Sequence, residues 1–151
     1  MNERFEVQGG YIGLFEWILD INRNQSWVTF LPRDLFEKSV ETYDDAIIAL
    51  ANTPILAPCY YIVAGPLPLQ GAVVTRDRTV AADVWKLGSN NTWFLAETNY
   101  DHWQKPLFID DRITPANKCM NKMGQDKSSF AGIFNVLSTK PVLNKVKIFF
   151  T

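Results

Sequence analysis

The sequence predicts an α+β fold, because helix-like and strand-like patterns occupy separate parts of the chain. Residues 56–98 contain short apolar runs separated by turn residues, which is typical of strands. The segments on either side repeat apolar residues every three or four positions, which is typical of helices. Helices gathered outside a run of strands favour α+β over an alternating α/β arrangement. The length of 151 residues suits one domain, 1–151.

The N-terminal segment predicts a strand and then a short apolar helix. Residues 3–8 alternate polar and apolar, and Gly9–Gly10 ends that pattern. Residues 11–19 are nearly all apolar, and their length suits one short helix. Two interpretations stay open for this helix: a buried element of the core, or an apolar lip that contacts lipid.

Two further helices are predicted before the strands. Ser26 is placed to cap a helix that runs to about residue 40, with Pro32 tolerated only near its first turn. Thr42 caps the next helix, and the acidic residues that follow it suit the positive end of a helix dipole. Residues 52–54 close this second helix.

An antiparallel meander of four strands is predicted after these helices. Glycine and proline residues at 65–68 and polar residues at 88–91 mark the turns. The expected strands cover residues 58–64, 71–76, 79–87 and 92–98. Strands that are apolar on both faces require cover on both faces, so we expect other elements to pack on each side.

Two helices and a last strand are predicted after the meander. Pro115 is tolerated in the first turn of a helix over residues 114–123, which Gly124 ends. Ser128 or Ser129 starts a second helix that runs through residue 137 with apolar residues three and four apart. Residues 145–151 alternate again and predict a strand.

Composition excludes several classes of function. Fifteen Lys and Arg against 16 Asp and Glu give a net charge of −1, so no electrostatic case for nucleic-acid binding exists. A single His and two Cys cannot build a typical zinc site or a disulfide framework. With no Gly-rich phosphate loop either, we expect neither a cofactor nor a metal. No apolar run reaches the roughly 20 residues that a membrane span needs.

Polar residues gather in residues 96–117, where the last predicted strand ends. Asn99 is there either a turn residue or a neutral amide donor for an oxyanion. Arg112 is either a structural partner of Asp110, Asp111 or Glu3, or a fixed cation near a nucleophile. The two neighbouring aspartates favour a loop ion network over an acid/base pair. Cys59, in mid-strand, is interpreted as a core residue.

Several motifs, in the same order along the chain, resemble one family. They are N-E-R-F at 2–5, G-G-Y-I-G-L-F-E-W-I-L at 9–19, V-V-T-R-D-R at 73–78, T-N-Y-D-H-W at 98–103, D-D-R-I-T-P-A-N-K-C-M-N at 110–121 and L-S-T-K-P-V-L-N-K at 137–145. This set resembles the large-subunit segment of the acid ceramidases and of their close relative, N-acylethanolamine-hydrolysing acid amidase. The resemblance implies part of the αββα sandwich of N-terminal-nucleophile hydrolases. It also implies that the Cys nucleophile lies upstream of the residues present here.

The resemblance implies roles for individual residues. Asn99, Arg112 and Glu3 match catalytic residues, while Tyr100, Asp101 and Trp103 are assigned to packing and His102 to no role. Cys119 matches a Cys that is disulfide-bonded to a small subunit, which is the implied partner. The implied substrate is a lipid amide, which we expect to contact the apolar residues Tyr11, Leu14, Phe15, Trp17 and Ile18.

The resemblance also implies a lysosomal or secreted glycoprotein. The sequons at Asn24 and Asn90 are the expected glycosylation sites. The expected reaction is hydrolysis of N-acylsphingosine to sphingosine and fatty acid, with transient contact to a membrane surface. Two alternatives stay open: an amidase for N-acylethanolamines, and an inactive paralogue that binds lipid or a partner.

Overall fold

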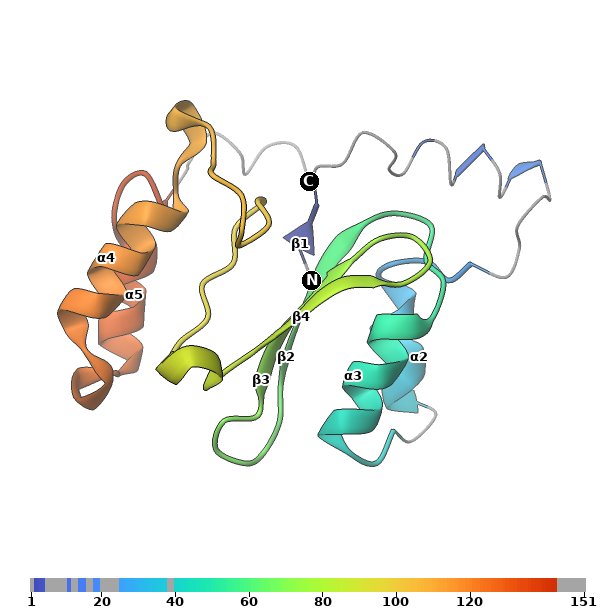
Figure 1. Ribbon diagram of the computed structural model, residues 1–151, viewed down its shortest axis with the longest axis horizontal. Helices are drawn as coiled ribbons and strands as arrows, with labels where there is room; N and C mark the ends of the chain where they lie inside the picture. The colour runs from blue at the N-terminus through green and yellow to red at the C-terminus, as the bar shows by residue number, and fades with distance from the viewer. Residues whose placement is uncertain are drawn as a thin grey trace. The chain divides into compact units, whose positions relative to one another are not determined.

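The computed structural model describes residues 2–4, 11, 14–15, 18–19, 25–37 and 40–143 (Figure 1). The chain divides into two compact units, Met1–Leu95 and Ala96–Thr151. That residues 1–151 form a single domain stays a prediction.

The first unit contains an antiparallel sheet with strand order β1-β2-β3-β4. The strands are β1 (Asn2–Glu3), β2 (Cys59–Ala64), β3 (Gly71–Arg76) and β4 (Ala81–Lys86). The meander over β2, β3 and β4 is therefore confirmed. The predicted strand over residues 3–8 begins one residue earlier, in β1, and residues 5–10 lie outside the described residues.

The fourth predicted meander strand is wrong, since residues 92–98 form no strand. After β4 the chain enters a left-handed turn, with positive φ at Gly88, Asn90 and Asn91, within a 3-10 helix at Ser89–Asn91. The neighbouring rings of Trp93 and Phe94 then contact each other edge to face at 4.9 Å. Successive side chains of a strand point to opposite faces, so this contact is incompatible with regular strand geometry.

Two helices pack on one face of this sheet: α2 (Phe30–Glu37) and α3 (Tyr43–Asn52). Thr42 caps α3 as predicted, because its hydroxyl oxygen accepts a hydrogen bond of 3.1 Å from the N–H of Asp45. The predicted cap at Ser26 is wrong, because Ser26 instead forms a parallel bridge with Ile55. Helix α2 begins four residues later, which keeps Pro32 within the first turn, where its missing N–H costs nothing.

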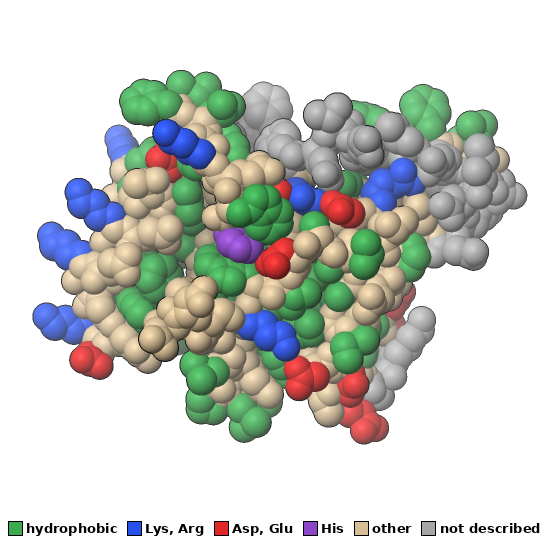
Figure 2. All heavy atoms as spheres, viewed as in Figure 1, with side chains coloured by type: hydrophobic (Ala, Val, Ile, Leu, Met, Phe, Trp, Pro, Cys, Tyr) green, Lys and Arg blue, Asp and Glu red, His purple; other side chains and the backbone are tan. Residues whose placement is uncertain are grey.

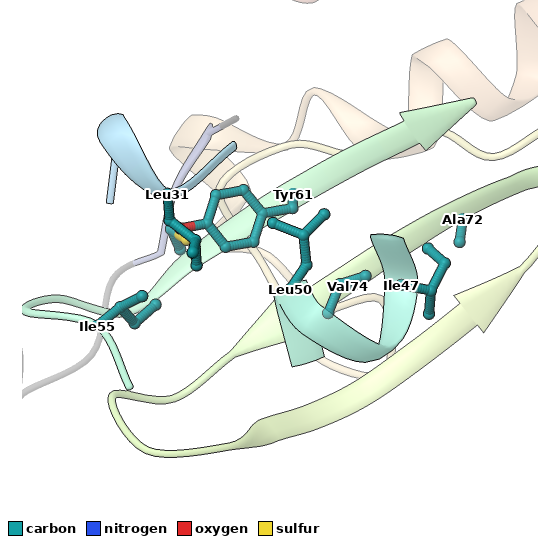
Figure 3. Packing of buried hydrophobic residues seen from close by; sticks show 8 residues of the cluster. Leu31, Ile47, Leu50, Ile55, Tyr61, Ala72 and Val74 are labelled. Atoms are coloured by element: carbon teal, nitrogen blue, oxygen red, sulfur yellow. The ribbon is translucent and has the colours of Figure 1, made fainter. Parts of the chain in front are cut away.

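The core of the first unit lies between these helices and the sheet. Side chains of α3 point toward β2 and β3 in Figure 3, where Ile47 and Leu50 meet Tyr61 and Val74. Alternate residues of β2 and β3 supply this face, as the two-residue period of strands requires. The buried cluster contains Leu31, Ile47, Leu50, Ile55, Cys59, Tyr61, Ala72 and Val74.

A buried arginine joins α3 to the sheet. The Arg76 side chain, fully buried on β3, donates hydrogen bonds to the carbonyl oxygens of Ala51 and Thr53. Those carbonyls lie at the C-terminal end of α3, where the helix dipole is negative and a cation is stabilising. The helix end is therefore held over the sheet by a charged group and not by apolar packing alone.

The second unit contains α4 (Ile113–Met123) and α5 (Phe130–Ser138), which lie side by side (Figure 1). Short 3-10 helices precede each of them, at Phe108–Asp110 and Gln125–Lys127. Both predicted helices are confirmed, and Ser129 caps α5 by accepting a 3.1 Å hydrogen bond from the N–H of Gly132. The strand predicted over residues 145–151 lies outside the described residues. No helix in the described ranges is both long and apolar enough to cross a membrane.

Replacing Leu50 with alanine tests the packing of the core. Leu50 is 6% exposed, so Leu50→Ala is expected to lower the free energy of unfolding by about 2–5 kcal/mol. Ile48, on the same helix but 60% exposed, provides the control, and Ile48→Ala is expected to change stability by less than about 0.5 kcal/mol. Urea denaturation measures both, and equal losses would contradict this assignment of the buried face.

Candidate active site

In the second unit, the side chain of Arg112 contacts Asn99, the other predicted catalytic residue of this unit. Its Nη2 donates a 2.6 Å hydrogen bond to Oδ1 of Asn99, and its Nε lies 3.2 Å from Oδ1 of Asp110. The side chains of Arg112 and Asp110 are only 16% and 18% exposed, so this ion pair is largely shielded from water. Residues 13 positions apart in sequence are thus brought into direct contact.

The backbone between Asp110 and α4 explains this geometry. The N–H of Arg112 donates to the carbonyl oxygen of Asp110 at 2.9 Å, which closes a tight turn. Asp111 does not share the ion pair: its Oδ1 accepts a 3.0 Å hydrogen bond from the N–H of Thr114 in the first turn of α4. The two aspartates therefore have separate roles. Asp110 forms the ion pair with Arg112, whereas Asp111 accepts a hydrogen bond from the first turn of α4.

The guanidinium group determines how the Asn99 amide is oriented. Arginine only donates hydrogen bonds, so the amide atom that faces it must be the oxygen. The N–H₂ group of Asn99 consequently points away from Arg112. An amide held in this way presents a neutral donor whose strength does not depend on pH.

Two further acids, Glu97 and Asp101, lie close to Asn99, and Glu97 is outside the motifs that predict site residues. Burial, and secondarily the charge of Asp101, raise the pKa of Glu97 from 4.5 to about 8. Its Oε1 is buried without a hydrogen-bond partner among the described residues. Asp101 is 3% exposed and accepts a 2.9 Å hydrogen bond from Gln104, which fits its predicted packing role. The available signal for Glu97 was an acid directly after the apolar residues 93–96.

The other predicted catalytic and substrate residues lie in the first unit. Glu3 belongs to β1, but its side chain is outside the described residues, as is all of Trp17. The described apolar residues of the 11–19 segment are helical and exposed: Tyr11 at 84%, Leu14 at 37%, Phe15 at 64% and Ile18 at 59%. This exposure does not fit a buried core helix, and contact of these residues with lipid stays a prediction.

The two cysteines differ in their surroundings. Cys59 is 1% exposed, and burial raises the pKa of its thiol to about 11, so it is a core thiol and not a nucleophile. Cys119 is a half-buried free thiol on α4, 3.9 Å from the hydroxyl of Thr139. Its disulfide to another subunit stays a prediction.

The sequons and the histidine lie at the surface where they are described. Asn90 is exposed in a turn, while Asn24 lies outside the described residues. His102 is exposed and contacts the ring of Trp103, and it is the one histidine visible in Figure 2. No group of three metal-ligating side chains occurs in the described part of the chain.

Replacing Glu97 with glutamine tests its burial. Because the pKa of Glu97 is raised in the folded state, its stabilising contribution is complete below the unfolded value of 4.5 and is lost as pH rises to about 8. Glu97→Gln is therefore expected to gain stability relative to the original protein across that pH range. Denaturant titration at several pH values measures this, with the exposed Glu41→Gln as control. Parallel pH profiles for the original protein and Glu97→Gln would contradict the assignment.

Comparison with known proteins gives a consistent result over the whole chain. It is 46% identical over its full length to the acid ceramidase of Macaca fascicularis and 45% identical to that of Homo sapiens, and it spans 38% of each. The solved structure of a Caenorhabditis elegans N-acylethanolamine-hydrolyzing acid amidase ortholog matches 95% of the chain and 59% of its own, with a TM-score of 0.73 and 37% identity. No family model matches the chain.

These matches identify the fold of the chain and the proteins to which it is related. The structural match confirms the predicted α+β class, as part of an N-terminal-nucleophile hydrolase fold. The chain spans less than half the length of the curated relatives that it matches. The relation predicted from the motifs is therefore confirmed: over its whole length this chain is related to a segment of the acid ceramidase family, with N-acylethanolamine-hydrolyzing acid amidase as a close relative.

Proposed function

We propose that this chain forms part of an acid amidase that hydrolyses the amide bond of N-acylsphingosine to sphingosine and a fatty acid. The observation that carries the proposal is the 2.6 Å hydrogen bond from Arg112 to Asn99. It positions an amide donor and a cation side by side in a segment that matches acid ceramidases.

Amide hydrolysis needs a nucleophile, a base and donors for the oxyanion that develops on the carbonyl oxygen. This chain supplies the donor through the N–H₂ group of Asn99. Arg112 holds that amide in place through the hydrogen bond to its oxygen. Cys59 is not that nucleophile, because it is buried and its pKa is raised.

The nucleophile is then a Cys in the part of the relatives that this chain does not match. Its freed α-amine is the base, its thiol attacks the amide carbon, and water hydrolyses the resulting acyl-enzyme. Cys119 links the two parts through a disulfide.

Glu97 contributes to the proposal through its protonation state. With a pKa of about 8, it is neutral at acid pH. A neutral carboxyl two residues from Asn99 adds no negative charge that would oppose the oxyanion. Protonated Glu97 is therefore compatible with hydrolysis at acid pH, whereas an ionised Glu97 would oppose it.

The exposed apolar residues of the 11–19 segment fit a lipid substrate. Burial of an acyl chain contributes about 0.8 kcal/mol for each methylene group. Tyr11, Leu14, Phe15 and Ile18 expose enough apolar surface to supply one wall of such a groove. The same surface would contact a membrane transiently, as expected for an enzyme of lipid catabolism in the lysosome or outside the cell. An exposed sequon at Asn90 is consistent with that glycoprotein route.

A second candidate substrate class is the N-acylethanolamines. It is favoured by the structural match to the N-acylethanolamine-hydrolyzing acid amidase ortholog, which covers 95% of this chain. The higher identity to acid ceramidases, 46% against 37%, supports N-acylsphingosine as the first candidate. A paralogue that only binds lipid or a partner is the outcome if neither amide is cleaved.

Reconstitution tests the proposal. The chain alone is expected to be inactive at acid pH, and activity on N-acylsphingosine is expected once the remaining segment of an acid ceramidase is supplied. Asn99→Ala should then lower kcat by about 10²–10³-fold with little change in KM, because it removes an oxyanion donor. Asn121→Ala, at an exposed position on α4, is the matched control.

Three results would count against the proposal. Turnover by the chain alone would show that the nucleophile is within it. Full activity of Asn99→Ala in the reconstituted enzyme would remove Asn99 from the site. Preference for an N-acylethanolamine over N-acylsphingosine would select the second candidate.

A further inference from the structure

A pocket of about 240 Å³ opens beside Arg112 in the second unit. Its polar lining is Asp110 and Arg112 from the turn before α4, together with Lys140 from the segment after α5. Its apolar lining is Ile109, Pro141 and Leu143. The pocket thus joins two segments about 30 residues apart, and each of them contributes a cation.

The charges on this lining leave a positive excess. Arg112 and Lys140 each carry +1 and Asp110 carries −1, which sums to +1. The ion pair with Asp110 already offsets the charge of Arg112 at 3.2 Å, so the excess belongs to Lys140. One monoanion would neutralise the pocket, whereas a dianion such as a phosphate monoester would leave it negative.

The guanidinium group of Arg112 also brings hydrogen-bond donors to the pocket lining. Nε of Arg112 is buried and makes no hydrogen bond within the described residues, although it lies at ion-pair distance from Asp110. An unused buried donor costs free energy until an oxygen accepts from it. A carboxylate has two oxygens, so it is able to accept from Arg112 and approach Lys140 at the same time.

The apolar part of the lining favours a carboxylate that carries an alkyl group. Ile109 is 90% exposed and Leu143 is 37% exposed, so alkyl groups placed against them would remove apolar surface from water. A pocket of this volume takes a carboxylate head and a short run of methylene groups rather than a complete long-chain lipid.

We propose that this pocket binds the carboxylate of an alkyl carboxylic acid, and that Lys140 is the residue that selects for its charge. The inference rests on the proposed function in one respect, because a fatty acid is the product that amide hydrolysis would release. A neutral amide gains little binding free energy from a second cation, whereas the carboxylate that forms on hydrolysis is attracted to it. Lys140 therefore favours the acid product over the substrate and increases competition by the product.

Direct binding of decanoate to this chain tests the inference without any need for turnover. Equilibrium dialysis of labelled decanoate at about pH 7, where the carboxyl group is ionised, is expected to show saturable binding. Lys140→Met keeps the length of the side chain and removes its charge, so the affinity is expected to fall about three- to tenfold. Lys140→Arg should keep the affinity within about twofold. Lys118→Met, which removes an exposed charge on α4 away from the pocket lining, should leave binding unchanged.

Methyl decanoate separates charge from packing. This neutral ester is expected to bind weakly and equally to the original protein and to Lys140→Met. Unchanged decanoate affinity in Lys140→Met, or an equal loss for the ester, would overturn the role of Lys140. An absence of saturable decanoate binding would overturn the pocket assignment itself.

The inference and the proposed amidase activity fail in different ways. Decanoate binding that depends on Lys140, together with no hydrolysis in the reconstituted enzyme, would leave the pocket and remove the amidase proposal. Hydrolysis by the reconstituted enzyme, together with decanoate binding that Lys140→Met does not change, would keep the amidase proposal and remove the proposed role of Lys140.

Discussion

The hydrogen bond from the Arg112 guanidinium to the Asn99 amide is the interaction on which this account depends. It joins the segment around Asn99 to the residue before α4, and it decides which end of the amide faces the guanidinium. The ion pair with Asp110 completes the arrangement, because it neutralises a guanidinium that is largely removed from water. Without Asp110, a half-buried cation would be left uncompensated, which is costly.

The two units use the same chemical device at different places. In the first unit, Arg76 donates to the last carbonyls of α3 and holds that helix end against the sheet. In the second, Arg112 lies at the first residue before α4 and donates to a side chain instead. The first arrangement satisfies backbone groups and is structural. The second orients the amide of a polar side chain, Asn99, that the proposed reaction uses.

Patterns with a local cause could be predicted from the sequence. The strands β2, β3 and β4 follow from alternation, and the caps at Thr42 and Ser129 follow from side chains that accept backbone hydrogen bonds. The ends of α4 follow from Pro115 in its first turn and from Gly124. Asn99 and Arg112 could be predicted only as two separate candidate residues. Their contact across 13 residues depends on the turn at Asp110, which the sequence does not reveal.

Tertiary context explains what could not be predicted. Ser26 pairs with Ile55 because a distant segment competes for its backbone, so its preference for a helix cap has no effect. Residues 92–98 have strand composition but no strand, because the left-handed turn at residues 88–91 redirects the chain. Glu97 was missed because its raised pKa comes from burial, which the sequence of one loop does not reveal. Lys140 lies in one of the motifs, but its place beside Arg112 arises from folding and could not be predicted.

A double-mutant cycle between Asn99 and Arg112 tests the central claim most directly. The measurement is kcat for amide hydrolysis by the reconstituted enzyme carrying Asn99→Ala, Arg112→Gln, or both. If Arg112 acts by orienting Asn99, its replacement should matter far less once Asn99 is alanine, with a coupling free energy of about 1–3 kcal/mol. Strictly additive losses would contradict the account, because they would mean that the two side chains act independently.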